Sequence, residues 1–289
     1  MDSDPIVVTH TDFAWQEAFM RFIPRVFPLS FRRWHELGGW DENYCAIAIT
    51  QGDEIIANAS LQRMTIALHG RELTGWQLGA VGVVPEYRGK GLQRRIMARV
   101  LGFASREDMM FLFANDDVLD FYPKFGFERA SEVIFGADHE VVPAGNRLRT
   151  LSLDRPDDRE LLARVSATAR PVTELFGARN YGGVVLWYWA NFYPDCLHYC
   201  PERDAVLVAT HDGDCLRICD VLASERVDLR EYLPRVATAR AQRIEFGFTP
   251  GPWWPDAGPV ADYTESRLFV RGPHEPPRTP FKFPLLAQT

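Results

Sequence analysis

The segment Val81–Met97 combines residue types and spacing that suit the binding of a phosphate group. An apolar strand pattern ends at Val84, two glycines follow at positions 89 and 91, and a helical pattern with several basic residues begins at Leu92. Because Gly89 and Gly91 lack a Cβ atom, a ligand can approach the main chain closely there. The first amides of a helix have no partner within it and can converge on an anion. The segment therefore predicts a phosphate-binding turn.

The spacing of the glycines distinguishes between the phosphate-binding motifs that use such a turn. A nucleoside triphosphate loop needs four residues between its first glycine and a Gly-Lys pair followed by Ser or Thr. Here six residues separate Gly82 from Gly89, which excludes that design. A dinucleotide-binding turn needs a third glycine where Arg94 stands, although Asp116 or Asp117 could act as its acidic partner. The missing glycine leaves this second design with little support.

After these two motifs are set aside, the segment still shows the pattern Val-x-Val-x-Pro over residues 81–85 and Arg-x-x-Gly-x-x over residues 88–93. It resembles the acetyl-CoA loop of the GNAT superfamily of N-acetyltransferases. A second segment, residues 115–127, follows an apolar run and ends in Phe-Tyr-x-Lys-x-Gly-Phe, which is similar to the family's short helix after its fifth strand. The resemblance covers roughly residues 5–140. It implies an α/β (α+β) fold with a mixed sheet flanked by helices, and acetyl transfer from acetyl-CoA to an amine.

The resemblance also implies roles for individual residues. Main-chain groups at Val81 and Val83 face the acetyl and pantetheine parts of acetyl-CoA, and an amide at this strand end stabilises the oxyanion. The amides from Gly89 to Arg94 bind the pyrophosphate, and Asn115 either bonds the pantetheine arm or caps the short helix that follows it. The expected cofactor-binding residues are Val81, Val83, Arg88, Gly89, Lys90, Gly91, Leu92, Gln93, Arg94 and Asn115.

Tyr122 is the expected catalytic residue, because it matches the family tyrosine that protonates the departing thiolate. A phenol with a pKa near 10 carries its proton at neutral pH and can act as a general acid. The identity of the general base is left open, because Gln77 stands where the family has its glutamate, and an amide cannot accept the proton. Glu42, Glu72 or a chain of ordered water molecules are the alternatives.

These residues favour an acetyl-CoA-dependent N-acetyltransferase acting on a primary amine of a small molecule or protein. Because Gln77 replaces the glutamate, a catalytically inactive acyl-CoA-binding or sensory protein is the alternative. Transfer to an alcohol, or of a longer acyl group, is also open. We expect acceptor selectivity to come from residues 27–40 and from aromatic residues of the second half, Trp187, Trp189, Trp253 and Trp254.

Composition limits the partners. The 289 residues include 32 Lys and Arg against 39 Asp and Glu, a net charge of −7 that argues against nucleic acid as the main partner. No run reaches the roughly 18 apolar residues of a membrane span, and the N-terminus lacks a secretory pattern, so we expect a cytoplasmic monomer or homodimer.

Cysteines four residues apart in strand-like segments lie about 13 Å apart. We therefore expect buried thiols and no metal at Cys196, Cys200, Cys215 and Cys219.

Length and pattern predict two domains, residues 1–142 and a second, smaller α/β module at residues 143–289. The second module is either a degenerate copy of the first or an unrelated domain. Pro24 and Pro28 should end the first helix, and Pro273–Pro284 should lie extended on the surface. The expected strands are residues 6–9, 44–50, 55–68, 73–84, 109–114, 205–211, 215–222, 244–248 and 267–270. The expected helices are residues 13–22, 30–37, 92–104, 157–170, 182–191 and 228–241.

Overall fold

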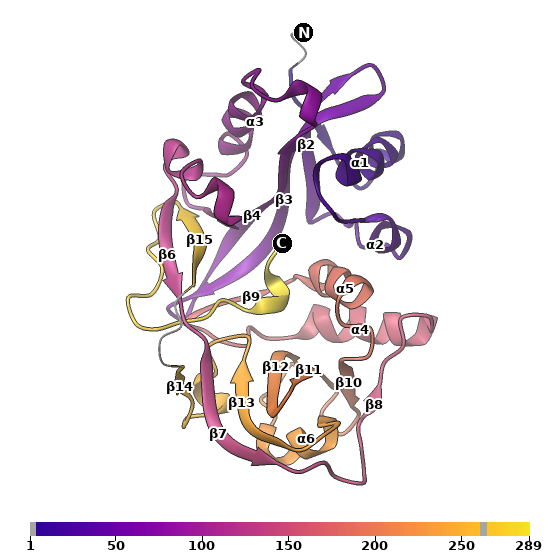
Figure 1. The fold of residues 1–289 in the computed structure, drawn as a ribbon, viewed down its shortest axis with the longest axis vertical. Helices are drawn as coiled ribbons and strands as arrows, with labels where there is room; N and C mark the ends of the chain where they lie inside the picture. The colour runs from indigo at the N-terminus through magenta and orange to yellow at the C-terminus, as the bar shows by residue number, and fades with distance from the viewer. Residues whose placement is uncertain (1–3, 261–264) are drawn as a thin grey trace.

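The computed structural model describes residues 4–260 and 265–289 and contains two mixed β-sheets, one above the other along the long axis of the molecule (Figure 1). The first sheet has the order β1-β2-β3-β4-β5-β15-β6, with β9 beside β3. Its strands are β1 (Ile6–Val8), β2 (Tyr44–Gln51), β3 (Glu54–Leu68), β4 (Arg71–Val83), β5 (Met109–Phe113), β6 (Glu128–Glu132), β9 (Phe176–Arg179) and β15 (Glu265–Arg271). The expected α/β class is confirmed.

The second sheet has the order β14-β7-β13-β12-β11-β10-β8. Its strands are β7 (Phe135–Val141), β8 (Arg149–Thr150), β10 (Leu197–Cys200), β11 (Ala205–Asp212), β12 (Cys215–Leu222), β13 (Ala241–Phe246) and β14 (Gly258–Pro259). The helices are α1 (Phe13–Val26), α2 (Arg32–Glu36), α3 (Leu92–Leu101), α4 (Pro156–Thr168), α5 (Gly182–Asn191) and α6 (Leu229–Val236). Helices α3 and α1 lie on opposite sides of the first sheet (Figure 1).

Two helix ends lie four or more residues from their predicted positions. Helix α1 runs through Pro24 to Val26, because a proline in the last turn removes only one backbone hydrogen bond and the amide of Phe27 still bonds the carbonyl of Ile23. Helix α6 ends at Val236 rather than at position 241. The chain turns to an extended conformation at the next residue, and β13 begins four residues later.

The two sheets exchange strands across the expected boundary at residue 142. Strand β7, from the first half of the chain, pairs with β13 and β14 of the second sheet. In the other direction, β15 inserts between β5 and β6, and β9 pairs with β3. The two sheets therefore do not divide at a single point of the chain.

The second sheet repeats the strand order of the first. Strands β10, β11 and β12 are antiparallel, and α6 then leads to β13, which is parallel to β12. In the first sheet β2, β3 and β4 are antiparallel, and α3 leads to β5, parallel to β4. One difference concerns ligand binding: the Asp228 carboxylate accepts a hydrogen bond from the amide of Arg230 at the start of α6. A carboxylate of the chain itself thus occupies the end of the helix where an anion would bind.

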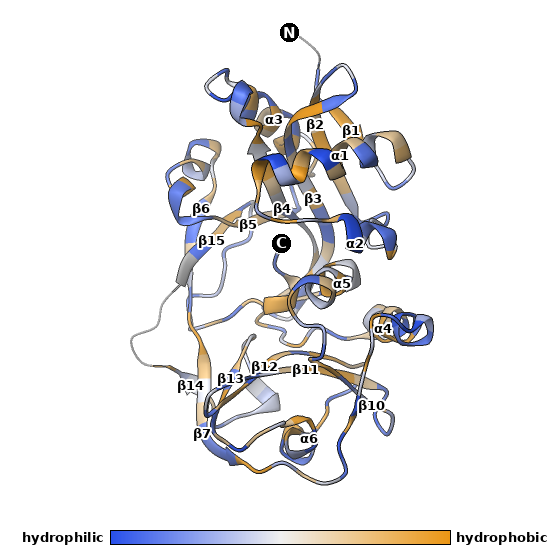
Figure 2. Cartoon of the chain, turned by 45° about the vertical axis from the view of Figure 1, so that its right-hand side comes forward, coloured by the Kyte–Doolittle hydropathy of each residue, from blue (hydrophilic) through white to orange (hydrophobic). Residues whose placement is uncertain are grey.

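The prediction that Pro273–Pro284 lies on the surface is right for its first part, because residues 273–280 are exposed or half-buried except for Pro277. It is wrong for residues 281–284, which are buried between the sheets. Phe281 and Phe283 are 2% and 0% exposed and pack against Phe176. The ammonium of Lys282 lies 3.1 Å from the Glu132 carboxylate, and both side chains are buried. Helix α5 and the C-terminus lie between the sheets in both views (Figures 1 and 2). The aromatic side chains of Phe281 and Phe283 explain this burial. The prediction had rested on the proline content of the segment alone.

Candidate active site

A cavity opens where two neighbouring strands of the first sheet separate. Strands β4 and β5 pair in parallel from Gly75 and Met109 to Leu78 and Leu112, whereas β4 continues to Val83. The cavity beside the separated end of β4 has a volume of about 1300 Å³. Leu78 to Val83 line it, so main-chain groups of this strand end are available to a ligand.

A bulge in β4 orients this strand end. The register with β3 shifts between Asn58 and Ser60, and Ala80, which lies opposite the shift, has a φ of 47°. This left-handed conformation is uncommon for a residue other than glycine. The buried amide of Asn58 donates hydrogen bonds of 3.0 Å to the carbonyl of Ala80 and to the Ser60 hydroxyl. Asn58 therefore holds the bulge in place.

The predicted phosphate-binding turn lies at one end of the cavity. After a short 3₁₀ helix, η1 (Pro85–Tyr87), Gly89 and Gly91 have φ values of 74° and 76°, and Gly91 is the N-cap of helix α3. A Cβ atom at either glycine would point into open space. The amides of the first turn of α3 cannot bond within the helix and are available to an anion. Geometry and donors both fit a pyrophosphate.

Most of the expected cofactor-binding residues line the cavity. The structure brings together Val81, Val83, Arg88, Gly89, Gly91, Leu92, Gln93, Arg94 and Asn115. Lys90 does not line it: its ammonium lies 4.5 Å from the centre of the Tyr87 ring. The Arg88 guanidinium donates a 3.3 Å hydrogen bond to the carbonyl of Val83, which ties the turn to the end of β4.

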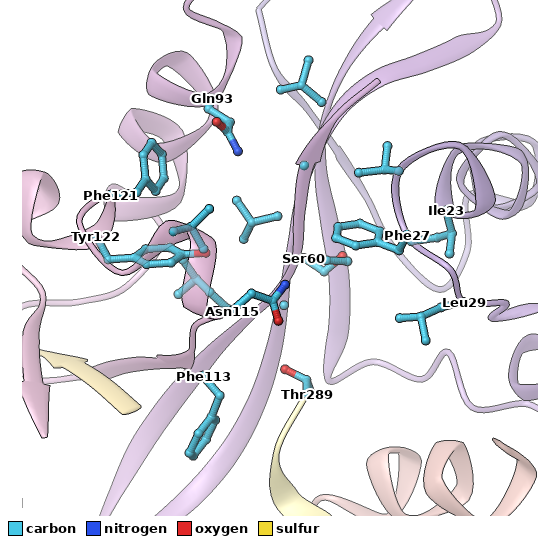
Figure 3. A pocket seen from close by; sticks show the side chains of 18 of the residues that line it. Ile23, Phe27, Leu29, Ser60, Gln93, Phe113, Asn115, Phe121, Tyr122 and Thr289 are labelled. Atoms are coloured by element: carbon cyan, nitrogen blue, oxygen red, sulfur yellow. The ribbon is translucent and has the colours of Figure 1, made fainter. Parts of the chain in front are cut away.

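Tyr122 and Asn115 face the cavity from the side of β4 on which the turn lies (Figure 3). Tyr122 begins the 3₁₀ helix η3 (Tyr122–Phe125), and its ring packs against Phe121 and Phe269. Burial raises the pKa of Tyr122 to about 12, so the phenol keeps its proton at neutral pH. Asn115 precedes the 3₁₀ helix η2 (Asp116–Val118), and its side chain makes no capping hydrogen bond to it. The side chain is thus available to a ligand.

The carboxylates considered as general base lie elsewhere. Neither Glu42 nor Glu72 lines the cavity, and Glu72 pairs with Arg179 at 2.6 Å on the surface. Gln77 is fully buried, and its amide has no hydrogen-bond partner within residues 4–260 and 265–289. Of the alternatives weighed from the sequence, only a chain of water molecules is compatible with these positions.

The other half of the cavity, across β4 from Tyr122, is mainly apolar. Phe27, Phe31 and Trp34 line it from the first two helices and the segment between them, and Trp187 lines it from α5. Trp189, Trp253 and Trp254 are instead buried in the packed interior. Sequence reasoning missed other lining residues, namely Tyr44, Ser60, Gln62, Gly183, Val184 and Thr289. Small or polar residues within the apolar pattern of β3 were a signal for Ser60 and Gln62.

The described part of the chain contains no group of three or more His, Cys, Asp or Glu side chains placed to hold a metal ion. Cys200, Cys215 and Cys219 lie in strands and are buried, as expected, whereas Cys196 is half-buried. Within the same residues, no helix has the length and apolar character needed to cross a bilayer.

The chain is also similar to known acetyltransferases. Residues 14–130 match the family model of the acetyltransferase (GNAT) domain. A GCN5-related N-acetyltransferase from Kribbella flavida is 16% identical, with a TM-score of 0.54 over 93% of this chain and 71% of that chain. Eis1 from Mycobacterium abscessus is 14% identical, with a TM-score of 0.55 over 93% and 73%. Among curated proteins, none matches this chain.

A third solved structure, a GCN5-related N-acetyltransferase from Anabaena variabilis, is 16% identical, with a TM-score of 0.52 over 92% of this chain and 72% of that chain. At these identities the similarity shows the fold, and it extends over both sheets. The turn and the separated strands agree with this similarity, and residues 14–130 are the part of the chain that matches the acetyltransferase (GNAT) domain.

Proposed function

We propose that the protein transfers the acetyl group of acetyl-CoA to a primary amine. The observation that carries this proposal is a single cavity that joins the turn at Gly89 and Gly91 to the buried phenol of Tyr122. The turn supplies amides for a pyrophosphate, with positive charge from Arg88 and Arg94, which line the same space. The phenol supplies a proton where a thiolate would leave.

Each task of the reaction has a candidate in this cavity. Acetyl-CoA brings the thioester, and the amine nitrogen forms a bond to its carbonyl carbon. A main-chain amide of the separated end of β4 stabilises the negative charge on the carbonyl oxygen, and the bulge at Ala80 fixes its direction. The carbon–sulfur bond then breaks, and Tyr122 gives its proton to the thiolate. The surplus proton of the nitrogen leaves through water, and solvent reprotonates Tyr122.

Gln77 favours a second candidate function, an acyl-CoA-binding protein without transferase activity. A buried amide without a hydrogen-bond partner among the described residues stands where a catalytic glutamate is expected. Such a protein would keep the turn at Gly89 and Gly91 but lack a carboxylate to accept the proton. The two candidates differ in one observable, the release of the CoA thiol in the presence of an amine.

The test combines binding and turnover. Calorimetry with CoA and acetyl-CoA should detect binding of both, and a thiol reagent should report CoA release when acetyl-CoA and a panel of primary amines are added. Binding without thiol release across the panel would favour the second candidate. If folded protein binds neither CoA nor acetyl-CoA, both candidates are wrong.

A further inference from the structure

We infer that the acceptor is an α-amino amide with an aromatic or other bulky apolar side chain, so that a neutral amide group stands one carbon away from the reacting amine. This inference rests on the proposed acetyl transfer and names its substrate class. It follows from two neighbouring surfaces of the cavity. We call them the polar patch, which consists of Ser60, Gln62 and Thr289, and the aromatic wall, which consists of Phe27, Phe31, Trp34 and Trp187.

The polar patch gathers side chains from two distant parts of the chain on one face of the first sheet. Ser60 and Gln62 are two residues apart on β3, so their side chains project to the same face. Ser60 is the register partner of Gly79 on β4. The hydroxyl oxygen of Thr289 lies 2.8 Å from the position that a Cβ atom at Gly79 would take. Ser60 and Thr289 therefore face the cavity side by side next to β4 (Figure 3).

The polar patch offers both donors and acceptors of hydrogen bonds. The Ser60 hydroxyl accepts a 3.0 Å hydrogen bond from the side chain of Asn58, so its own O–H can be donated to a ligand. The Gln62 side chain gives one N–H to the carbonyl of Arg63 at 3.0 Å and keeps its carbonyl oxygen as an acceptor. The exposed hydroxyl of Thr289 can do either. A substrate amide, which carries a carbonyl oxygen and N–H groups, matches this mixture.

Two further donors of this half of the cavity also favour a ligand with a carbonyl group. The Tyr44 hydroxyl and the Trp187 indole nitrogen are buried and have no hydrogen-bond partner within residues 4–260 and 265–289. Buried polar atoms are paired in most proteins. A ligand that brings a carbonyl oxygen to this place would satisfy a donor that the protein leaves unpaired.

The distance from the reacting group fits an amide on the α-carbon. The polar patch begins beside Gly79, two residues before Val81, whose main chain is expected to face the acetyl group. Two residues of a strand span at most about 6.6 Å. In an α-amino amide the carbonyl oxygen lies about 3 Å from the amine nitrogen, and a hydrogen bond adds about 3 Å. The amide would therefore reach the patch while the amine reaches the thioester.

The aromatic wall suits the side chain of such an acceptor. The rings of Phe31 and Trp187 are edge-to-face with centroids 5.7 Å apart, and those of Phe31 and Trp34 are edge-to-face at 5.5 Å. The Trp34 indole donates a 2.8 Å hydrogen bond to the carbonyl of Gly183, which joins α2 to the start of α5. Because contact with these rings removes apolar surface from water, a bulky apolar side chain gains more than a methyl group.

The main test changes the amide of the substrate and the polar patch together. The ratio of kcat/KM for L-phenylalaninamide to that for phenethylamine, which lacks the amide, is measured in the wild type, Gln62→Met and Thr289→Val. The two amines differ in basicity, but this difference is the same for every variant and cancels when the ratios are compared. We expect the ratio to fall by about 3- to 10-fold in each variant, because each loses one hydrogen bond to the amide.

Variants at Thr289 keep the test valid if Gln62→Met does not fold, because Thr289 is exposed. Thr289→Ser retains the hydroxyl and should retain the wild-type ratio. The matched control is Thr238→Val, since Thr238 is also exposed and lies between α6 and β13, outside the cavity. A wild-type ratio in Thr289→Val and in folded Gln62→Met would overturn the inference.

L-alaninamide tests the aromatic wall, because it keeps the α-amide and replaces the aromatic side chain by a methyl group. We expect kcat/KM for phenylalaninamide to exceed that for alaninamide by about 10-fold or more, and Trp187→Ala to narrow this difference. Equal values for the two amides in the wild type would overturn the apolar part of the inference.

A small amide and the first residue of a peptide are two sources of the same chemistry. A groove of about 490 Å³ shares Phe27 and Leu29 with the cavity and leads along Phe192 toward solvent, where Phe192 is 53% exposed. Residues that follow the first one of a peptide would fit there. A higher kcat/KM for a tripeptide amide that begins with phenylalanine than for phenylalaninamide assigns the peptide, and a lower value assigns the small amide.

Calorimetry with the CoA-bound protein separates failure of this inference from failure of acetyl transfer. If no amine releases the CoA thiol, but phenylalaninamide binds more tightly than phenethylamine and loses this advantage in Thr289→Val, acetyl transfer is wrong and the acceptor class stands as a ligand class. If neither amine binds, or if the variant leaves the difference between them unchanged, the inference fails.

Discussion

Gly91 shows how one residue decides whether the phosphate-binding turn forms. Its φ of 76° is favourable for glycine and strained for a branched side chain, and a Cβ atom would point into the open space where we propose that the pyrophosphate binds. We expect Gly91→Val to lower CoA affinity by about 100-fold or more, measured by calorimetry. Gly102→Ala, at the other end of α3, is the control, because Gly102 has a φ of −83° and no close contact at its Cβ position. Normal affinity in Gly91→Val would contradict the proposed turn.

Tyr122 carries the second prediction at this scale. Because burial raises its pKa to about 12, the phenol is protonated over the whole working pH range. We expect Tyr122→Phe to lower kcat by about 100-fold, the contribution of a general acid, and to leave the Kd of acetyl-CoA nearly unchanged. Single-turnover thiol release and calorimetry measure the two quantities. An unchanged rate would remove Tyr122 from the acid role.

Residue-level reasoning reached the cofactor side of the cavity and part of its apolar half, since residues 27–40 and Trp187 were expected to select the acceptor and contribute to the lining. Gly91 and Tyr122 lie in short motifs whose spacing carries chemical meaning, so their neighbourhood could be predicted. Trp187 and Thr289 come from distant parts of the chain, and nothing local to them indicates that they meet. The position of Lys90, stacked on Tyr87, was also not predictable, because a flexible lysine can turn to either side of a loop.

At the scale of elements, the bulge in β4 depends on one buried side chain. Removing the Asn58 amide leaves the carbonyl of Ala80 without its donor, and a buried unpaired polar group costs about 1–3 kcal/mol. We expect Asn58→Ala to lower the free energy of unfolding by that amount and to reduce kcat/KM for acetyl-CoA. Ala80→Gly should keep wild-type kinetics, since glycine adopts the left-handed conformation without strain. Wild-type kinetics in Asn58→Ala would show that the bulge does not need this amide.

A second element-level contact predicts a dependence of stability on pH. The Tyr181 hydroxyl, at the start of α5, donates a 2.9 Å hydrogen bond to the Asp220 carboxyl group of β12. Burial raises the pKa of Asp220 to about 7, above its unfolded value. The folded state therefore binds a proton that the unfolded state lacks, and this stability is present below about pH 4 and is lost as the pH rises through 7.

We expect the wild type to lose stability relative to Asp220→Asn between pH 5 and pH 8. Because asparagine cannot ionise, the variant lacks this contribution, and the other titrating groups cancel in the comparison. Chemical denaturation at both pH values measures the difference in free energy of unfolding. A difference independent of pH would show that Asp220 is ionised to the same extent in the folded and unfolded states.

Most strands of the first sheet followed from local pattern, whereas in the second sheet only β11, β12 and β13 did. Helix α5 begins and ends as predicted, and β11 and β12 form the expected hairpin, because apolar runs bounded by glycine, asparagine or aspartate define their ends. The bulge at Ala80 could not be predicted, since alanine gives no sign of a left-handed conformation. Its cause is Asn58, on the neighbouring strand.

At the scale of the whole molecule, a buried ion pair holds the C-terminal segment between the sheets. The Glu132 carboxylate accepts hydrogen bonds from the Lys282 ammonium at 3.1 Å and from the amide of Phe283 at 2.7 Å. Removing the ammonium takes a buried hydrogen-bonded partner from this carboxylate, so we expect Lys282→Met to lower the free energy of unfolding by about 3–5 kcal/mol. Denaturant titration of the wild type and the variant measures this difference in the free energy of unfolding.

The double variant with Glu132→Gln is the control for this ion pair. Glutamine removes the negative charge but keeps a carbonyl for the amide of Phe283, so the double variant should be more stable than Lys282→Met alone. A loss below about 1 kcal/mol in the single variant, which is typical of exposed pairs, would show that the pair does not hold the segment.

The pairing of the two sheets was the least predictable feature. The expected boundary at residue 142 rested on a loosened pattern. The three helices on each side were predicted, but several strands on each side were not. An apolar strand such as β15 can pair with an edge in either half, because its pattern specifies a buried face and not a partner. The strand exchange therefore depends on contacts between distant residues.

The position of β15 sets an order of events during synthesis on the ribosome. Strands β5 and β6 emerge early but meet only through residues 265–271, which emerge more than a hundred residues later. Until then the nascent chain carries the turn at Gly89 and Gly91 on a sheet with unprotected edges, a state prone to wrong pairing. Messages cut short before codon 265 should therefore yield polypeptides that aggregate or are degraded.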